Sequence, residues 1–306
     1  MQAAHTVLLV RPARFGYNAE TALTNHFQQT LTGLDAGAAQ RQALAEFDAA
    51  VAALRAGGIE VLVFDDTAAP AKPDAVFPNN WLSLHADGRA LLYPMCAPSR
   101  RAERRPDILA ALGRRFQLRD IIDLSHHEAA GRYLEGTGSI IFDHEQRVAY
   151  AALSPRTDAG LFAEVCALLG YRPVAFHAVD AQGQAIYHTN VMMCLAPGVA
   201  VVCLASLREA AERAAVVAAL EAGGRSILDI TPAQVACFAG NMLALQPAEG
   251  RPVMVLSQSA HDALMPAQHA QLARHCTLLP LRIPTIETLG GGSARCMLAE
   301  VWLPLA

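Results

Sequence analysis

The sequence predicts an α/β protein in which a unit of two strands, a helix and a third strand is repeated five times along residues 1–306. Three observations lead to this prediction. Four helix-like segments end in glycine and run directly into an apolar stretch. Paired apolar stretches with a turn between them separate these helices, and a small polar cluster precedes each pair.

The helix-like segments end at Gly57, Gly113, Gly170 and Gly223, and the intervals between these glycines are 56, 57 and 53 residues. Glycine is favoured just beyond a helix because it adopts the left-handed conformation there, so we expect such a cap at each of the four. A fifth, weaker copy reads PAQHAQLARHC followed by TLLPLRI and lacks the glycine.

The strand pairs are NNWLSLHADGRALLY, GTGSIIFDHEQRVAYAAL, TNVMMCLAPGVAVVCL and GNMLALQPAEGRPVMVLS, with a last copy, ARCMLAEVWL, at the end of the chain. ADGR and APG lie between apolar runs, as hairpin turns do. A doubly wound parallel sheet is the alternative for alternating helices and strands, but such a sheet does not need hairpin pairs. Because the polar clusters occupy one fixed place in each unit, a closed radial arrangement would bring all five to one axis.

Composition narrows the classes of protein. Apolar residues make up 53% of the chain and charged residues 17%, which favours a sizeable core over disorder. The net charge of −4 gives no cationic surface for nucleic acid. Lys72 is the single lysine, and neither a P-loop nor a Schiff-base motif surrounds it. Seven cysteines without a C-x-x-C pair favour a reducing compartment, and no apolar run is long enough to span a membrane, so we expect a soluble cytoplasmic protein.

The polar clusters carry the unusual residues: FPNN (77–80), EGTGS (135–139), YHTN (187–190), AGN (239–241) and GGGSARC (290–296). In this order and spacing the sequence resembles the guanidino-group-modifying superfamily of arginine deiminases, dimethylarginine dimethylaminohydrolases and amidinotransferases. It looks most similar to the citrulline-utilisation hydrolase branch. The resemblance covers nearly the whole chain. It implies a five-bladed α/β propeller (pentein), a small-molecule amino-acid substrate and covalent chemistry that needs no cofactor. The spacing of the five units predicts one catalytic domain over residues 1–306. From charge and composition we expect no nucleic-acid partner and no membrane partner, and a homo-oligomer stays open.

The resemblance also implies roles for three residues. Cys296 matches the nucleophile, which attacks as a thiolate. His188 matches the general acid and base, and Glu135 matches the carboxylate that orients this histidine. Each has a structural alternative: a small buried hydrophobic residue for Cys296, a histidine bonded to backbone for His188, and an exposed acid at a strand end for Glu135.

The departures from the family pattern indicate the substrate. Asn80, Gly138 and Asn190 stand where enzymes that act on cationic guanidinium groups have aspartates. A buried guanidinium without carboxylate partners is costly, whereas an amide both donates to and accepts from a neutral ureido group. We therefore expect citrulline, hydrolysed to ornithine, ammonia and carbon dioxide through a covalent Cys296 intermediate. Alternatively, these are turn residues and a displaced acid, Asp74 or Asp143, compensates.

Further residues are assigned to substrate binding. Arg156, in LSPRTD, matches the family arginine that holds the α-carboxylate, and Arg100 and Arg101 match a second basic element, with the inward-facing one of the two left open. The polar clusters add Asn79 and Asn241. Residues 14–25 are either a lid or a surface loop. The string HHE (126–128) lacks the spacing of metal ligands, so we expect no metal.

Three other functions stay open from the sequence. An arginine or methylarginine deiminase or dimethylaminohydrolase keeps the nucleophile and changes the substrate. An amidinotransferase replaces water by an acceptor amine, for which no motif is found. A non-catalytic binding protein shares the propeller fold, but the joint presence of Cys296, His188 and Glu135 argues against it.

Overall fold

A computed structural model of the chain describes residues 1–30, 33 and 35–306. The strands are β1 (Thr6–Arg11), β2 (Glu60–Asp65), β3 (Leu82–Leu84), β4 (Arg89–Leu92), β5 (Asp120–Asp123), β6 (Ile141–Asp143), β7 (Val148–Ala152), β8 (Arg172–Phe176), β9 (Met193–Ala196), β10 (Val199–Val202), β11 (Ser226–Asp229), β12 (Leu243–Leu245), β13 (Val253–Ser257), β14 (Thr277–Leu281) and β15 (Ala299–Val301).

The α-helices are α1 (Ala19–Ala22), α2 (Ala36–Ala56), α3 (Pro106–Gly113), α4 (Gly136–Ser139), α5 (Ala159–Leu169), α6 (Ala210–Ala222), α7 (Pro232–Ala236), α8 (Gln258–Ala263), α9 (Pro266–Ala273) and α10 (Pro284–Gly290). The 3-10 helices are η1 (Pro78–Asn80), η2 (Pro98–Glu103), η3 (Ser125–Ala130), η4 (Thr189–Val191), η5 (Leu204–Ser206) and η6 (Ala294–Met297). Within these described residues, no helix is long and apolar enough to cross a membrane.

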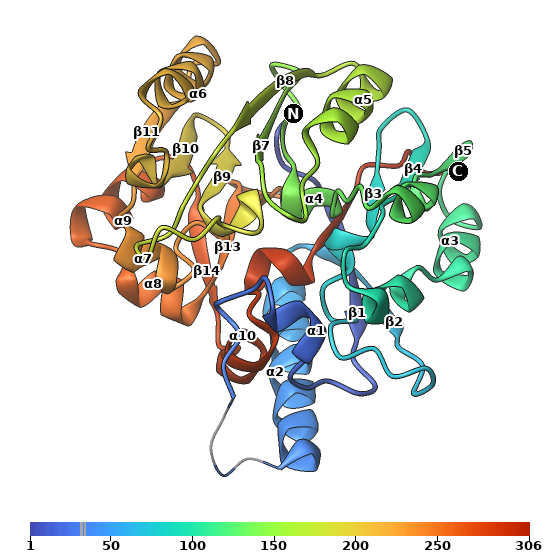
Figure 1. Cartoon of the computed structure of the whole chain (residues 1–306). Coiled ribbons are helices and arrows are strands. Elements are labelled where there is room, and N and C mark those ends of the chain that lie inside the picture. The colour runs from blue at the N-terminus through green and yellow to red at the C-terminus, as the bar shows by residue number, and fades with distance from the viewer. Residues whose placement is uncertain (31–32, 34) are drawn as a thin grey trace.

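The strands pair in the repeating pattern that the sequence predicts. β3 is antiparallel to β4, and β4 is parallel to β5. The same order holds for β6–β7–β8, β9–β10–β11 and β12–β13–β14. A parallel pair needs a crossover connection, and α3, α5, α6 and the pair α8–α9 supply it. Figure 1 shows these helices at the periphery of the molecule, outside the strands.

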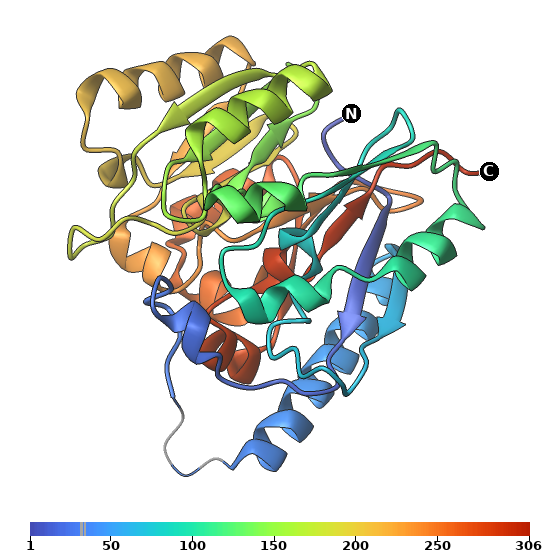
Figure 2. The same cartoon turned by 45° about the vertical axis from the view of Figure 1, so that its right-hand side comes forward.

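The fifth unit is built from both ends of the chain. β15 pairs antiparallel with β1, and β1 pairs parallel with β2 after the long helix α2. The turned view shows the blue β1 beside the red β15 (Figure 2). A single bridge between Val301 and Leu84 joins this unit to β3–β4–β5, so two units share one six-stranded sheet. The last strand-pair segment of the sequence, ARCMLAEVWL, therefore contributes β15, and the strand that pairs with it is β1 from the start of the chain.

The glycines that end the helices differ from the expectation. Only Gly170 is itself the left-handed cap, with φ of 72°. After α2 and α6 the left-handed residue is the second glycine of each pair, Gly58 (φ 79°) and Gly224 (φ 71°). Gly113 is the last residue of α3 and is helical. The expectation of a left-handed cap at all four was wrong, because a Gly-Gly pair lets the positive φ fall one residue later.

The predicted polar clusters lie in short helical turns next to strand ends. η1, α4, η4 and η6 hold four of the five clusters, and η1 contacts both α4 and η6, while α4 contacts η4. These turns come from different units, so the repeat brings together side chains that are far apart in the sequence.

A buried ion pair joins two neighbouring units of the core. Arg225, just before β11, donates from Nε and Nη2 to the two carboxylate oxygens of Asp143 in β6, at 2.9 and 2.7 Å, and both residues are almost fully buried. Asp143 is thus committed to a structural pair. The alternative in which Asp143 serves the substrate was wrong, because its carboxylate faces Arg225 and not the polar clusters.

Arg225→Met leaves the Asp143 carboxylate buried without its cationic partner, with only the backbone N–H groups of Glu145 and Gln146 still donating to it. This variant is expected to lower the free energy of unfolding by about 3–5 kcal/mol. Urea unfolding followed by circular dichroism measures the change. Arg172→Met, at an exposed position in β8, is the control and should shift the value by less than about 0.5 kcal/mol. The double variant Arg225→Met/Asp143→Leu should recover most of the loss; a double variant no more stable than Arg225→Met would contradict this account.

Candidate active site

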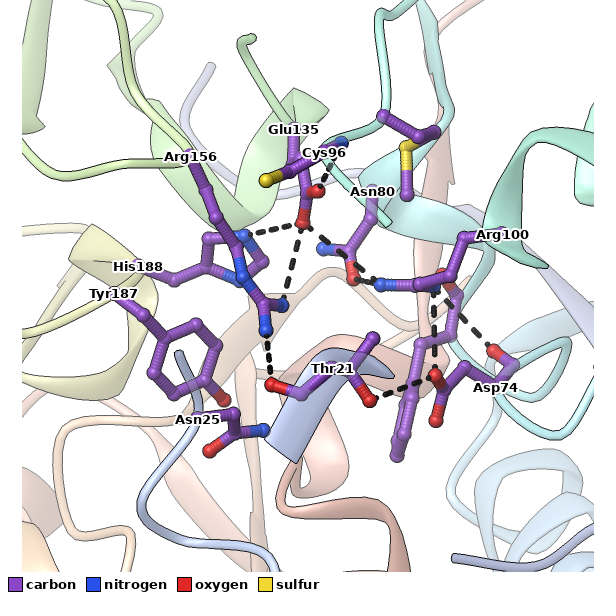
Figure 3. Close-up of polar contacts among 12 residues, drawn as sticks. Thr21, Asn25, Asp74, Asn80, Cys96, Arg100, Glu135, Arg156, Tyr187 and His188 are labelled. Carbon is purple, nitrogen blue, oxygen red and sulfur yellow. Dashed lines mark hydrogen bonds and ion pairs between the residues drawn. The ribbon is translucent and has the colours of Figure 1, made fainter. Parts of the chain in front are cut away.

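A small cavity lies where the turns of several units meet, and Cys296, His188, Asn80, Arg100 and Arg156 line it. Figure 3 shows all of these except Cys296, with their polar contacts. The remaining lining residues are Thr21, Asn25, Asp74, Phe77, Tyr187, Gly290 and Gly292. The free space is about 10 Å³, on the order of one water molecule, so a substrate must displace side chains to bind.

The thiol of Cys296 faces polar donors. Cys296 lies in η6 and is 2% exposed, and its sulfur accepts hydrogen bonds from Asn190 Nδ2 at 3.4 Å and Asn241 Nδ2 at 3.3 Å. The Asn241 amide is fixed in this orientation because its Oδ1 accepts from the backbone N–H of Arg295 at 3.0 Å. Two side-chain amides therefore donate to this sulfur. Burial raises the pKa of Cys194, a thiol elsewhere in the core, to about 12, as expected for an inert thiol.

His188 and Glu135 form a buried pair. His188 Nε2 lies 2.9 Å from Glu135 Oε2, and Glu135 Oε1 accepts the backbone N–H of Cys96 at 2.9 Å. Both residues are almost fully buried, so the alternatives of a backbone-bonded histidine and an exposed acid are wrong. Figure 3 shows the carboxylate between the imidazole of His188 and the guanidinium of Arg156.

The charges of this pair follow from its surroundings. Burial alone would raise the pKa of Glu135, but the charge of Arg156 and the hydrogen bond from His188 bring that pKa well below its usual range. Burial lowers the pKa of His188 to about 4, even though Glu135 opposes this change. At neutral pH an ionised Glu135 therefore adjoins a neutral His188. Because the carboxylate can only accept, His188 Nε2 carries the proton and Nδ1 is the free base.

Asn80 and Gly138 are physically linked. Asn80 Oδ1 accepts from Arg100 Nη1 at 2.7 Å, and Asn80 Nδ2 donates to Asn79 Oδ1 at 3.1 Å. A Cβ atom at Gly138 would lie 2.4 Å from Asn80 Nδ2 and 2.7 Å from His188 Nδ1. The sequence assigned Gly138 to substrate binding, but in the structure Gly138 does not line the cavity. It leaves the space that the Asn80 amide and the His188 ring occupy. Asn79 supports Asn80 and does not line the cavity.

Of the two tandem arginines, Arg100 faces the cavity. It is 3% exposed and donates to both carboxylate oxygens of Glu103, at 2.9 and 2.8 Å. Arg101 points away, toward Glu128 at 3.2 Å, and is about one third exposed. Of the pair that the sequence left undecided, Arg101 does not line the cavity, because successive residues of η2 point in different directions.

Arg156 and the segment 14–25 meet above the cavity. Arg156 Nη2 donates to the carbonyl oxygen of Thr21 at 2.7 Å, and its guanidinium stacks on the ring of Tyr187 at 4.9 Å. Asn25 Nδ2 donates to the carbonyl oxygen of Gly291 at 3.0 Å, next to the nucleophile loop. Segment 14–25, which contains α1, thus covers the cavity rather than lying on a remote surface.

Asp74 is the site residue that the sequence offered only as a compensating acid. Its Oδ2 accepts from Asn18 Nδ2 at 2.7 Å and Thr21 Oγ1 at 3.3 Å, while Oδ1 is buried without a hydrogen-bond partner among the described residues. Burial raises the pKa of Asp74, and the nearby charge of Arg100 opposes this. No local pattern marks it, since an acid in a loop before FPNN is ordinary. That Asp74 Oδ1 has no partner among the described residues follows only from the tertiary structure.

The string HHE (126–128) lies in η3, away from the cavity. Across residues 1–30, 33 and 35–306, no group of three or more His, Cys, Asp or Glu side chains is arranged to hold a metal ion.

Comparison with known proteins places this geometry in context. A family model described as N,N dimethylarginine dimethylhydrolase, eukaryotic, matches residues 11–303. No curated protein sequence matches.

Three solved structures are similar in fold. The N-terminal domain of ArgZ, an arginine dihydrolase from the ornithine–ammonia cycle in Cyanobacteria, solved with bound substrate, has a TM-score of 0.75 and 16% identity over 98% of each chain. AgrE with ornithine and NAD⁺ has a TM-score of 0.76 and 15% identity, covering 100% of this chain and 40% of AgrE. A dimethylarginine dimethylaminohydrolase adduct with S-methyl-L-thiocitrulline has a TM-score of 0.62 and 17% identity, covering 97% and 99% of the two chains.

His188 is expected to stay neutral until the pH approaches about 4, because burial outweighs the attraction of Glu135. The side-chain nitrogen resonances of ¹⁵N-labelled protein, recorded between pH 4 and 8, measure the protonation of His188. The resonances that disappear in His188→Gln are those of His188. His177, which is exposed, serves as an internal control. Protonation of His188 near the ordinary value of 6.5 would contradict the electrostatic account.

Proposed function

This chain belongs to the N,N-dimethylarginine dimethylhydrolase family, within the guanidino-group-modifying enzymes, and on that premise we propose that it is a cysteine-dependent hydrolase of a ureido or guanidino amino acid, with citrulline as the first candidate substrate. The observation that carries the proposal is one cavity that joins the Cys296 thiol, the His188–Glu135 pair and the groups for an amino-acid zwitterion. We also propose that the five strand units close into a five-bladed propeller, since the turns of four of these units contact one another.

Three charged residues fit the α-amino and α-carboxylate groups of an amino acid. The unpartnered Oδ1 of Asp74 can accept from an ammonium group. Arg100 and Arg156 border the same cavity. Arg100 already donates from Nε and Nη2 to Glu103, so it would add positive charge, and Arg156 would offer its guanidinium to the carboxylate. All three are nearly fully buried, so these interactions would be strong and would orient the substrate before reaction.

The reacting end would lie at Cys296. As its sulfur attacks the ureido carbon, the thiol proton passes to His188 Nδ1, and the resulting imidazolium is stabilised by Glu135. His188 then gives this proton to the departing nitrogen, leaving the carbonyl group bound to sulfur. Water, deprotonated by His188, cleaves the carbon–sulfur bond and restores the thiol. The product of this cleavage is a carbamate, which decomposes to carbon dioxide and the second nitrogen compound. In total, citrulline and water yield ornithine, ammonia and carbon dioxide.

The amides around the thiol favour a neutral head group. Asn190 and Asn241 contact the sulfur, and Asn190 Oδ1 is buried without a partner among the described residues, so it can accept an N–H of the substrate. The Glu135 carboxylate is already paired with His188 and Arg156. A ureido group needs no anionic partner, whereas a guanidinium does.

Arginine is the second candidate, and a specific observation favours it. Asp74 provides a buried carboxylate oxygen with no hydrogen-bond partner in the described chain, which could face a guanidinium instead of an ammonium group. The structural relatives include an arginine dihydrolase and a complex of AgrE with L-arginine. The same nucleophile would first release ammonia from arginine to give citrulline. N,N-Dimethylarginine, as the family description suggests, would release dimethylamine in that step.

Incubation of the purified protein with citrulline, arginine or dimethylarginine in separate reactions distinguishes these substrates. We expect ornithine from citrulline, detected by mass spectrometry, and a loss of at least about 10³-fold in Cys296→Ala, because the covalent route is removed. Cys166→Ala, which removes a buried thiol in α5, is the matched control and should keep its activity. Conversion of arginine to citrulline with no attack on citrulline would overturn the citrulline proposal. The absence of turnover on all three would overturn the hydrolase proposal.

Gly138→Ala is expected to lower kcat at least about 100-fold, because the new methyl group would displace the Asn80 amide and the His188 ring. Steady-state kinetics on the preferred substrate measure the effect. Gly113→Ala, at the end of α3, meets only Leu118 at 3.9 Å and should leave kcat unchanged. Full activity of Gly138→Ala would show that neither group needs its present position.

A further inference from the structure

A second and much larger cavity, about 540 Å³, lies beside the active site. Its size falls within the range of small-molecule sites in proteins. Phe27 forms part of its wall, and the ring of Phe27 lies 6.0 Å from that of Tyr187, which lines the active-site cavity. Phe27 and Tyr187 thus stand between the two cavities.

The walls are apolar and aromatic, and the charged groups are mainly acidic. Phe27, Phe238 and Val235 supply apolar surface, and Asp180 and Glu287 supply carboxylates. Among the described residues that line the cavity, none is lysine or arginine. Such a composition favours a cation with an apolar body, because carboxylates attract its charge and aromatic faces interact favourably with cations.

Two further features of the cavity wall support a binding function. Phe238 has φ of 60°, and a bulky residue in the left-handed region is a genuine outlier. Strained residues of this kind cluster at active and ligand sites, where the surrounding structure holds them. Glu287 is only 7% exposed, and its carboxylate oxygens accept from Ser259 Oγ at 2.6 Å and Ser293 Oγ at 2.5 Å. The carboxylate of this wall residue is therefore held in place.

We propose that this cavity is a binding site for a small organic cation with an apolar body, separate from the active-site cavity. The carboxylate of Glu287 would face the cationic group, and the rings of Phe27 and Phe238 would contact the apolar body. This inference goes beyond the proposed hydrolase function and does not depend on it.

The site is connected to the nucleophile loop by direct contacts. Ser293 Oγ donates to Glu287, and the backbone carbonyl of Ser293 accepts the N–H of Cys296 at 3.0 Å. On the other side of Phe27, the hydroxyl of Tyr187 donates to the carbonyl oxygen of Gly291 at 2.6 Å. Occupation of the cavity would therefore change the surroundings of Cys296 through both Ser293 and Gly291.

Cys237, an exposed thiol on the cavity wall, offers a readout that needs no activity. The probe is benzylammonium, with benzyl alcohol as its neutral match and benzoate as its anionic match. We expect saturating benzylammonium to slow the alkylation of Cys237 by iodoacetamide at least about three-fold, whereas the other two compounds leave the rate unchanged. Peptide mass spectrometry measures the rate, and added glutathione reports the intrinsic reactivity of the reagent.

Two variants test where the cation binds. Ala233→Trp, at an exposed position of the cavity wall, fills the site and should abolish the protection, while Ala233→Ser should retain it. Glu287→Gln keeps the side-chain volume, removes the charge and should raise the Kd for benzylammonium at least about ten-fold. Equal protection by all three compounds, protection by none, or unchanged protection in Ala233→Trp would overturn the proposal.

Discussion

The buried carboxylate of Glu135 is the constraint on which the rest of the active site depends. A carboxylate removed from water is stable only with hydrogen-bond donors and opposite charges around it. Here His188, Arg156 and the backbone N–H of Cys96 supply them, and Arg100 lies 3.9 Å away. Each of these groups comes from a different polar turn or loop, so stabilising one charge also assembles the base and the two arginines of the proposed substrate site.

Space is the second constraint. The close approach at Gly138 allows the Asn80 amide and the His188 ring to sit side by side, and Arg100 orients that amide through its oxygen. Asn80 and Gly138, which both stand where the guanidinium-binding enzymes have aspartates, therefore depend on each other: the amide needs the space that the glycine leaves. The amides of Asn190 and Asn241 complete a neutral polar surround for the thiol. That combination is the physical basis for the proposed ureido substrate. The unpartnered Oδ1 of Asp74 supports the alternative substrate, arginine.

Much of the fold was predictable because the repeat leaves local signals. Hairpin turns such as ADGR, and glycines after helices, located the strand pairs and most crossover helices. The closure of β15 on β1 was not predictable, since no local pattern pairs residues 299–301 with residues 6–8. The choice between Arg100 and Arg101 was equally hidden, because it depends on the rotation of η2 about its own axis.

By itself the sequence determined the class of fold, the repeat, the superfamily and the group of polar turns that contain Cys296, His188 and Glu135, because these depend on local periodicity and on motifs. Only the tertiary structure decided which of those side chains face one another. It paired Asp143 with Arg225 in the core, turned Asp74 toward the cavity and laid residues 14–25 over it. Such choices rest on the burial and pairing of charges between segments distant in the chain, which no local pattern records.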